Sequence, residues 1–261
     1  MQHEIHLLTS NSSIFLGRLS NKKNCSIFCT FLHFFIQYSR YDNLQKYNLP
    51  YPEAVFDVNF YRNNPYPFQS LAKEIWPGMT HTPTVTHCFV KLLQEKGLLL
   101  RNYTQNIDGL EVLAGVESSK VLECHGHFRS AHCIDCKSSF DAEACKYQML
   151  NELVPPVCPA CGGYVKPSIV FFGEGLSEAF GMNIRRDLMQ CDLLLVMGTS
   201  LKVQPVALIP ELVPHHCPRV LFNRELVGDF DEDNWRDVFE PGDCDDRYVH
   251  NNWKRKFLCF W

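Results

Sequence analysis

Two closely spaced pairs of cysteines constrain this chain more than any other feature. Two residues separate Cys133 from Cys136 and Cys158 from Cys161, and 21 residues lie between the pairs. Such pairs can surround one Zn²⁺ ion with a tetrahedron of thiolates. Four thiolates leave no open position for water, so we expect a structural zinc ion and no metal catalysis. Four core thiols at a coincidental spacing are the alternative.

A candidate catalytic residue, His125, precedes the first cysteine by eight residues and is followed by Gly126. An imidazole has an ordinary pKa of about 6.5, which suits a general base at neutral pH. Taken alone, His125 is better explained as a buried structural histidine. The surrounding motifs have to decide between the two explanations.

The composition is that of a globular chain. Its 261 residues are 46% hydrophobic and 13% aromatic, which suits one large domain or a domain with a small module. Lys and Arg number 25 against 29 Asp and Glu, and this balance argues against a broad electrostatic grip on nucleic acid. The 13 cysteines are an odd number, and most lack metal spacing, so we expect a reducing, intracellular compartment rather than disulfides.

Residues 1–40 differ in character from the rest of the chain. They carry four basic side chains against one acidic one, and residues 26–36 are apolar. This run is too short to span a bilayer and lacks a cleavage site, so a buried strand or an extension is favoured over a targeting role. No membrane partner is expected. Without an Arg-rich presequence, a cytoplasmic or nuclear location is favoured, and a mitochondrial one is the alternative.

Regular helix and strand signals follow residue 41. Proline turns separate predicted helices at residues 57–61 and 68–76, and the helical periodicity of residues 84–96 ends at Gly97, a natural C-cap. Continuous apolar runs predict strands at residues 97–103, 168–172, 192–197 and 219–222. Such strands, separated by helix-length segments, favour an α/β fold with a parallel sheet covered on both faces. The cysteine pairs interrupt this pattern like an inserted zinc ribbon.

Polar residues follow each predicted strand, where ligands bind in open α/β sheets. The clusters are Gln105-Asn106-Ile107-Asp108, Gly173-Glu174-Gly175, Gly198-Thr199-Ser200 and Asn223-Arg224-Glu225. We expect all of them to meet at one edge of the sheet. Gly198 and the hydroxyls beside it can present N–H and Oγ groups to a phosphate, whereas Asn106 and Asp108 are explained equally well as turn formers.

In this order, the motifs resemble the sirtuin family of NAD⁺-dependent protein deacylases, closest to the branch of cytosolic and mitochondrial deacetylases. The resemblance extends over residues 41–245 and implies a Rossmann-like sheet domain, NAD⁺ as co-substrate and one structural Zn²⁺ ion. The matching stretches are Tyr103 to Leu110, His125-Gly126, the four cysteines, Val165 to Glu174, Gly198 to Ser200 and Asn223 to Glu225.

The resemblance also implies a reaction and residue roles. In the family, the acyl-lysine amide oxygen attacks the nicotinamide ribose of NAD⁺, and the products are nicotinamide, O-acyl-ADP-ribose and free lysine. His125 would be the general base, and Asn106 would lie near the ribose and water. The implied NAD⁺ contacts are Gln105, Asn106, Ile107, Asp108, Gly198, Thr199, Ser200, Asn223, Arg224, Glu225 and Cys244.

The implied partner is an acetylated or acylated lysine in a protein or peptide, histone or non-histone, and no direct nucleic-acid contact is implied. The peptide would add a strand between Gly173-Glu174 and Lys202-Val203, so main-chain hydrogen bonds would supply affinity. Val170 and Phe172 would line the acyl-lysine tunnel, although ordinary strand core explains them equally well.

The chain departs from the family in one block. The family's first strand, its Gly-Ala-Gly loop and a Gly-Ile-Pro-Asp-Phe-Arg segment hold the pyrophosphate, and residues 1–40 stand in their place. Residues 26–36 supply a replacement strand, the block comes from an alternative transcript or a gene-model error, or the chain has lost NAD⁺ binding. The intact remaining motifs favour the second explanation. A smaller departure is Ser168, where an acidic residue is common.

We therefore expect a Rossmann-like domain at residues 41–124 and 165–245, with a helical part at 41–96 and its usual first strand missing or replaced. Residues 125–164 would form the zinc module, between a divergent segment at residues 1–40 and a tail at residues 246–261. The leading hypothesis is an NAD⁺-dependent protein deacetylase. The alternatives are a catalytically silent module that binds acyl-peptides or proteins, and a protein ADP-ribosyltransferase.

Overall fold

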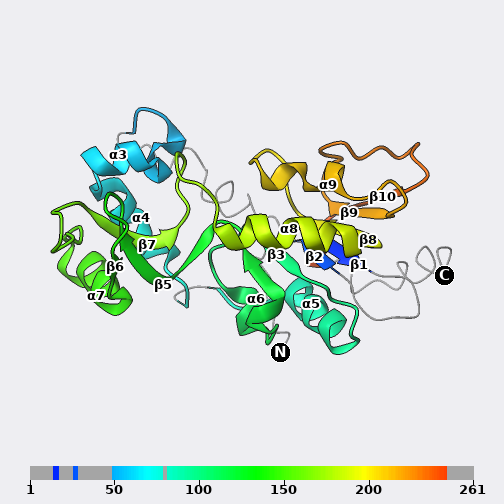
Figure 1. Cartoon of the computed structure of the whole chain (residues 1–261), viewed down its shortest axis with the longest axis horizontal. Coiled ribbons are helices and arrows are strands. Elements are labelled where there is room, and N and C mark those ends of the chain that lie inside the picture. The colour runs from blue at the N-terminus through cyan, green and yellow to red at the C-terminus, as the bar shows by residue number, and fades with distance from the viewer. Residues whose placement is uncertain (1–13, 18–25, 29–48, 79–80, 246–261) are drawn as a thin grey trace, which may run out of the picture.

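Two β-sheets organise the chain in the computed structural model, which describes residues 14–17, 26–28, 49–78 and 81–245 (Figure 1). The larger sheet has the strand order β10-β9-β8-β1-β2-β3-β4. Its strands are β1 (Ile14–Gly17), β2 (Ser26–Phe28), β3 (Asn102–Thr104), β4 (Val121–Glu123), β8 (Leu193–Met197), β9 (Arg219–Asn223) and β10 (Asp237–Pro241).

All strands of this sheet except β1 run in the same direction. β2, β3 and β4 pair in parallel, and so do β8, β9 and β10. β1 pairs antiparallel with both β2 and β8, and it thereby joins the two parallel groups without reversing either. The predicted parallel sheet is confirmed, with β1 as the exception. The carboxyl ends of β3, β4, β8 and β9 consequently lie at one edge.

The place of the replaced first strand is filled by β1 and β2, which lie between β8 and β3. Ser26–Phe28 forms β2, so the start of the predicted replacement strand does enter the sheet. Residues 29–36 of that prediction and the predicted tail at 246–261 lie outside the described residues.

Hydrophobic side chains cover both faces of the large sheet, as predicted. Leu193, Leu195 and Met197 of β8 belong to a core shared with Val90, whereas Leu194 and Val196 point into another core. Successive residues of a strand face opposite sides of the sheet, so β8 is buried on both faces. We call the large sheet and its helices the large-sheet lobe. Its helices are α5 (Val85–Glu95), α6 (Leu110–Leu113), η3 (Ser118–Lys120), α8 (Glu178–Gln190), η5 (Val206–Leu208) and α9 (Ile209–Leu212).

The smaller sheet, of order β6-β5-β7, is antiparallel and carries the cysteine pairs. Its strands are β5 (Gly126–Cys133), β6 (Ser139–Phe140) and β7 (Val165–Ile169). The helices packed with this sheet are η2 (Pro52–Phe56), α3 (Val58–Asn63), α4 (Tyr66–Ile75), α7 (Ala142–Tyr147) and the π-helical turn η4 (Gln148–Glu152). We call these elements the small-sheet lobe. In Figure 1 it lies beside the large-sheet lobe.

Local signals explain the helix boundaries. Asp57 caps α3 by accepting backbone N–H groups of Asn59 and Phe60 at 2.8 and 2.9 Å. The helix predicted for residues 84–96 is α5, which begins after a Thr84 capping box and is followed by Gly97 at φ +68°. Among the described residues, no helix is both long and apolar enough to cross a membrane.

The strand predicted for residues 168–172 was assigned to the wrong sheet. Only its first two residues, Ser168 and Ile169, lie in a strand, and that strand is β7 (Val165–Ile169), which pairs antiparallel with β5. An apolar run reads the same in either sheet, so periodicity alone does not distinguish them. Tyr61 fixes the small-sheet position, since its hydroxyl donates 2.8 Å to the Val165 carbonyl and its ring packs edge-on against Phe171.

Candidate functional site

The four predicted zinc ligands lie together. The Sγ atoms of Cys133, Cys136, Cys158 and Cys161 are all within 4.8 Å of one another, with two of the residues buried and two exposed. A tetrahedral Zn²⁺ ion with Zn–S bonds of about 2.3 Å requires sulfurs about 3.8 Å apart. The observed Cys133–Cys161 and Cys136–Cys158 separations of 3.4 and 3.7 Å fit that requirement. These four cysteines would hold the ion, and it would tie the two loops together.

The backbone around the cluster is shaped for sulfur ligands. The N–H groups of Asp135 and Gly163 donate to the sulfurs of Cys133 and Cys161, both at 3.4 Å. A Cβ atom at Gly163 would come within 2.4 Å of the Asp135 carboxylate and 3.1 Å of the Cys133 sulfur, so a side chain there would push the Asp135 side chain aside next to the cluster. Such outer contacts orient metal ligands.

Three of the four predicted polar clusters follow strands β3, β8 and β9, whose carboxyl ends lie at the same edge of the large sheet. Gly198 donates its N–H to the Phe222 carbonyl, and the Asn223 side chain donates to the Thr199 carbonyl at 3.0 Å. Thr199 Oγ1 accepts the N–H of Leu201. The residues after β8 and β9 therefore form one hydrogen-bonded unit. The fourth cluster, Gly173-Glu174-Gly175, follows the small sheet instead, so the expected meeting of all four is wrong.

Two further predicted residues lie beside this unit. Arg224 forms an ion pair of 2.7 Å with Asp243, and Gly242 donates its N–H to the Asn223 carbonyl. Cys244 is buried, and its sulfur lies 3.5 Å from the Phe222 carbonyl oxygen. The segment with Cys244 is thus attached to the end of β9, while Arg224 and Glu225 are exposed to solvent.

Buried polar groups at this edge lack partners within the described chain. Gln105 and Asn106 are 4% and 3% exposed, and neither amide oxygen accepts a hydrogen bond. The buried Ser200 Oγ likewise has no hydrogen-bond partner in the described chain. Buried groups of this kind cost free energy unless something satisfies them. The amide and hydroxyl chemistry fits a ligand rich in hydroxyl and carboxamide groups, as NAD⁺ is.

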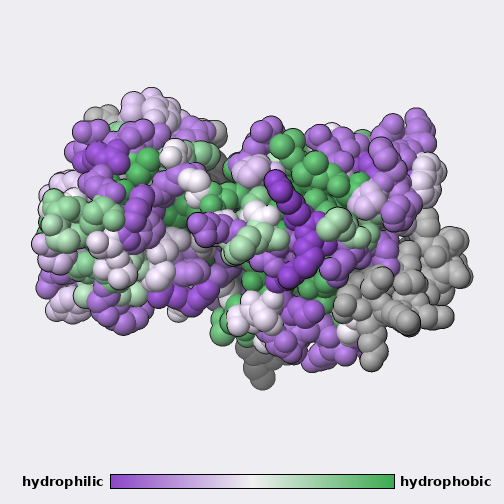
Figure 2. Space-filling view, viewed as in Figure 1, coloured by the Kyte–Doolittle hydropathy of each residue, from purple (hydrophilic) through white to green (hydrophobic). Residues whose placement is uncertain are grey.

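His125 lies at the junction of the two sheets. β3 and β4 are parallel neighbours, and the Cys124 N–H donates to the Thr104 carbonyl at 2.7 Å, which places His125 beside Gln105. On its other side, the His125 carbonyl accepts the N–H of Val170. Figure 2 shows the surface hollowed between the two lobes. The candidate base is therefore anchored to both.

Burial lowers the pKa of His125 to about 4, and a hydrogen bond to the Gln105 backbone opposes that shift only partly. The imidazole is consequently neutral at pH 7, the form that accepts a proton. Gly126 fixes this turn at φ +76°, where a Cβ atom would lie 2.0 Å from the Ser168 carbonyl oxygen. Steric crowding thus explains why glycine follows His125.

A second carboxylate near the site escaped the sequence analysis. Glu111 of α6 is fully buried, and neither of its oxygens has a hydrogen-bond partner in the described chain. Burial and the Glu111 charge raise the pKa of Asp108 to about 7. The sequence contains no signal for this, because a Glu in a short helix is ordinarily solvated.

The predicted Ile107, between Asn106 and Asp108, is half-buried and packs against the small-sheet core.

The predicted substrate residues lie where the small-sheet lobe ends. Phe172 exchanges backbone hydrogen bonds with Phe56 and Val58, yet its side chain is 45% exposed. Val170 is half-buried and Gly173 is exposed. Val203 is half-buried, and its carbonyl accepts the N–H of Ala207, so it is already tied to η5. The roles of these residues stay predictions.

Comparison with known proteins agrees with these features. A family model described as the Sir2 family matches residues 36–205. The chain is 46% identical over 224 residues to NAD-dependent protein deacetylase sirtuin-2 of Danio rerio, covering 79% of this chain and 59% of that protein. It is 48% identical over 205 residues to NAD-dependent protein deacetylase hst2 of Schizosaccharomyces pombe, covering 78% and 61%.

A third relative, NAD-dependent protein deacetylase sirtuin-3 of Mus musculus, is 49% identical over 204 residues, covering 78% of this chain and 60% of that protein. The chain thus spans about three-fifths of the length of these relatives. The α/β sheet with a four-cysteine cluster and the family match lead to the same conclusion. The chain belongs to the Sir2 family.

Proposed function

We propose that this chain is an NAD⁺-dependent protein-lysine deacetylase or deacylase that forms nicotinamide, O-acyl-ADP-ribose and free lysine. One observation carries the proposal: a neutral, half-buried His125 lies beside Gln105 and Asn106, whose amide oxygens accept no hydrogen bond from the described residues. An imidazole base adjacent to unsatisfied amides suits a sugar whose hydroxyl must lose a proton. The names of the relatives, all NAD-dependent deacetylases, support the same chemistry.

Different residues at the sheet edge would bind the two ends of NAD⁺. Gln105, Asn106 and Asp108 would bind the nicotinamide and ribose end, while Thr199, Ser200 and Asn223 would bind the phosphate and adenosine end. NAD⁺ supplies the ribose carbon that takes up the acyl-lysine oxygen as nicotinamide leaves. Neutral His125 would then accept the proton of a ribose hydroxyl and so make that oxygen nucleophilic.

The acyl-lysine would reach the site from the exposed segment after β7. Phe172 and Gly173 expose their surfaces there, and an extended peptide can add main-chain hydrogen bonds to such a segment. The substrate class is an acylated lysine in a protein or peptide. The zinc ion would hold the small-sheet lobe together and take no part in the reaction.

Nicotinamide release from an acetyl-lysine peptide tests the proposal. The intact chain should release nicotinamide only when both NAD⁺ and the peptide are present, and His125→Tyr should reduce the rate by about a hundredfold or more. Release that is absent from the intact chain, or unchanged in the variant, contradicts it. Calorimetry with NAD⁺ separates a silent module from an enzyme, and mass spectrometry of the peptide detects ADP-ribosylation.

A further inference from the structure

Residues 242–245 follow β10 beside the proposed NAD⁺ edge, and we call them the post-β10 segment. On one side, this segment is attached to the end of β9. Gly242 donates its N–H to the Asn223 carbonyl, and the Asp243 carboxylate accepts a hydrogen bond of 2.7 Å from Arg224. Asn223 is one of the residues proposed to bind the phosphate and adenosine end of NAD⁺. The post-β10 segment therefore borders that part of the site.

On its other side, the segment is attached to the start of α5 through one carboxylate oxygen. Asp245 Oδ1 accepts the hydroxyls of Thr84 and Thr86 at 2.9 and 2.8 Å, and it accepts the Thr86 N–H at 3.1 Å. Thr86 is 1% exposed and Asp245 is half-buried, so water competes little for these hydrogen bonds. The two ends of this contact are about 160 residues apart in sequence.

Helix α5 has a cap of its own. The Thr84 N–H donates to His87 Nδ1 at 3.2 Å, in a capping box that the helix forms from its own residues. The first N–H groups of a helix also favour a nearby anion, which makes the start of α5 a firm attachment point for Asp245. The contact therefore constrains the post-β10 segment more than it constrains α5.

The segment is also packed between the same two elements. Cys244 is 3% exposed and lies in one hydrophobic cluster with Val90 of α5 and Phe222 of β9. Within the segment, the Asp245 N–H donates to Asp243 Oδ1 at 3.1 Å. Packing, internal hydrogen bonds and the Asp245 carboxylate together hold the segment between α5 and β9.

We propose that Asp245 is a positioning residue for NAD⁺, because its carboxylate fixes the post-β10 segment where it borders the adenosine end of the cofactor. Asp245 acts through the backbone of the segment and needs no contact with NAD⁺ itself. A segment that is already held in place loses less conformational freedom when the ligand binds. The proposal deepens the proposed function and rests on it for the place of NAD⁺.

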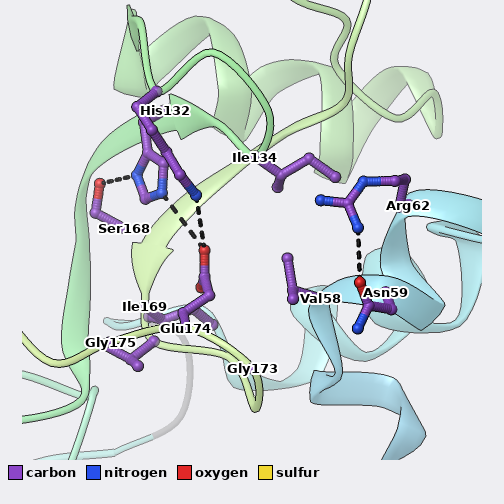
Figure 3. Close-up of a pocket in the computed structure, with 12 residues that line it drawn as sticks. Val58, Asn59, Arg62, His132, Ile134, Ser168, Ile169, Gly173, Glu174 and Gly175 are labelled. Atoms are coloured by element: carbon purple, nitrogen blue, oxygen red, sulfur yellow. Dashed lines mark hydrogen bonds and ion pairs between the residues drawn. The ribbon is translucent and has the colours of Figure 1, made fainter.

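The proposed peptide site lies apart from this contact and provides an internal control. Gly173 and Glu174 line a cavity of about 610 Å³ in the small-sheet lobe, together with Asn59 and Arg62 of α3 (Figure 3). Among the described residues, none that lines this cavity belongs to α5 or to the post-β10 segment. Loss of the Asp245 contact should therefore leave peptide affinity unchanged.

Calorimetry with ADP-ribose, which carries the adenosine end of NAD⁺, tests the proposal without turnover. Asp245→Ala should raise the Kd for ADP-ribose about tenfold, and Asp245→Asn, which keeps an oxygen acceptor, should raise it less than about threefold. In steady-state kinetics, Asp245→Ala should raise the KM for NAD⁺ and leave kcat and the KM for an acetyl-lysine peptide within about twofold. A general loss of structure would lower kcat as well.

Matched variants locate the effect. Thr86→Val keeps the shape of the side chain and removes one donor to Asp245, so it should raise the Kd about threefold. The double variant should bind no more weakly than Asp245→Ala, because that contact is already lost. Asp141→Ala is the control, since Asp141 caps α7 in the small-sheet lobe by accepting the Ala144 N–H at 2.6 Å. Its Kd should equal that of the intact chain.

Thermal melting verifies that each variant is folded. Equal Kd values for the intact chain and Asp245→Ala overturn the inference, and so does equal weakening by Asp141→Ala. If Asp245→Ala does not fold, an unchanged Kd in Thr86→Val overturns it. Absence of ADP-ribose binding by the intact chain overturns the inference together with the proposed function, whereas nicotinamide release by the intact chain tests that function alone.

Discussion

The Asn223 side chain donates a hydrogen bond of 3.0 Å to the Thr199 carbonyl oxygen and thereby joins the ends of β8 and β9. The same amide nitrogen also donates 2.8 Å to the Glu225 carbonyl. One side chain thus sets the spacing of two polar clusters that are 24 residues apart in sequence. The geometry of the proposed NAD⁺ edge depends on it.

Replacing Asn223 should therefore weaken NAD⁺ binding. Asn223→Ala removes two hydrogen bonds worth about 1 kcal/mol each and with them the side-chain contact between the ends of β8 and β9, so we expect the Kd for NAD⁺ to rise about tenfold or more. Asn183→Ala is the control, since the Asn183 side chain, far from this edge in sequence, forms its hydrogen bonds with Ala179 and Arg186 of the same helix, α8. Calorimetry measures both. Equal affinities of the two variants would show that this contact does not shape the cofactor site.

The His125 imidazole should titrate far below an ordinary histidine. Because burial lowers its pKa to about 4, the ring stays neutral from pH 8 down to about pH 5. NMR of isotope-labelled histidine should show one resonance with a midpoint near pH 4, and that resonance should be missing from His125→Tyr. A midpoint above pH 6 would mean that the ring is solvated in the folded chain.

Much of the site was predictable because it follows strand ends. The β8 and β9 strands appear in the sequence as apolar runs, and the polar residues after them lie where such strands must end. The zinc ligands were predictable for a similar reason, since their spacing is local. Helix α5 carried its own periodicity and caps.

The rest depends on contacts between distant residues. The sequence does not reveal that Val165–Ile169 pairs with β5, because an apolar run has the same pattern in either sheet. Nor does it reveal the reversed direction of β1, which is set by its neighbours β2 and β8. The buried Lys166–Glu174 pair likewise exists only after the chain has folded, and so does the buried Glu111, which has no hydrogen-bond partner in the described part of the chain.

Loss of one thiolate should release the zinc ion and loosen the small-sheet lobe. Cys161→Ser leaves three sulfurs, and metal binding is coupled to folding, so we expect loss of one equivalent of zinc and a lower melting temperature. Cys88→Ser is the control, because this exposed cysteine of α5 lies outside the cluster. Atomic absorption and calorimetric melting report the result. Retention of a full equivalent by Cys161→Ser would contradict a four-thiolate site.

A methyl group at Gly126 should be far more damaging than one at Gly162, although both glycines have positive φ, at +76° and +79°. The Cβ of Gly126→Ala would lie 2.0 Å from the Ser168 carbonyl oxygen, whereas that of Gly162→Ala meets nothing within 4 Å. Gly162→Ala should cost about 1 kcal/mol of unfolding free energy from the dihedral angle alone. Gly126→Ala adds a backbone clash, which must separate β5 from β7 and displace His125. Urea unfolding and nicotinamide release measure both effects, and equal destabilisation by the two variants would contradict the close approach at Ser168.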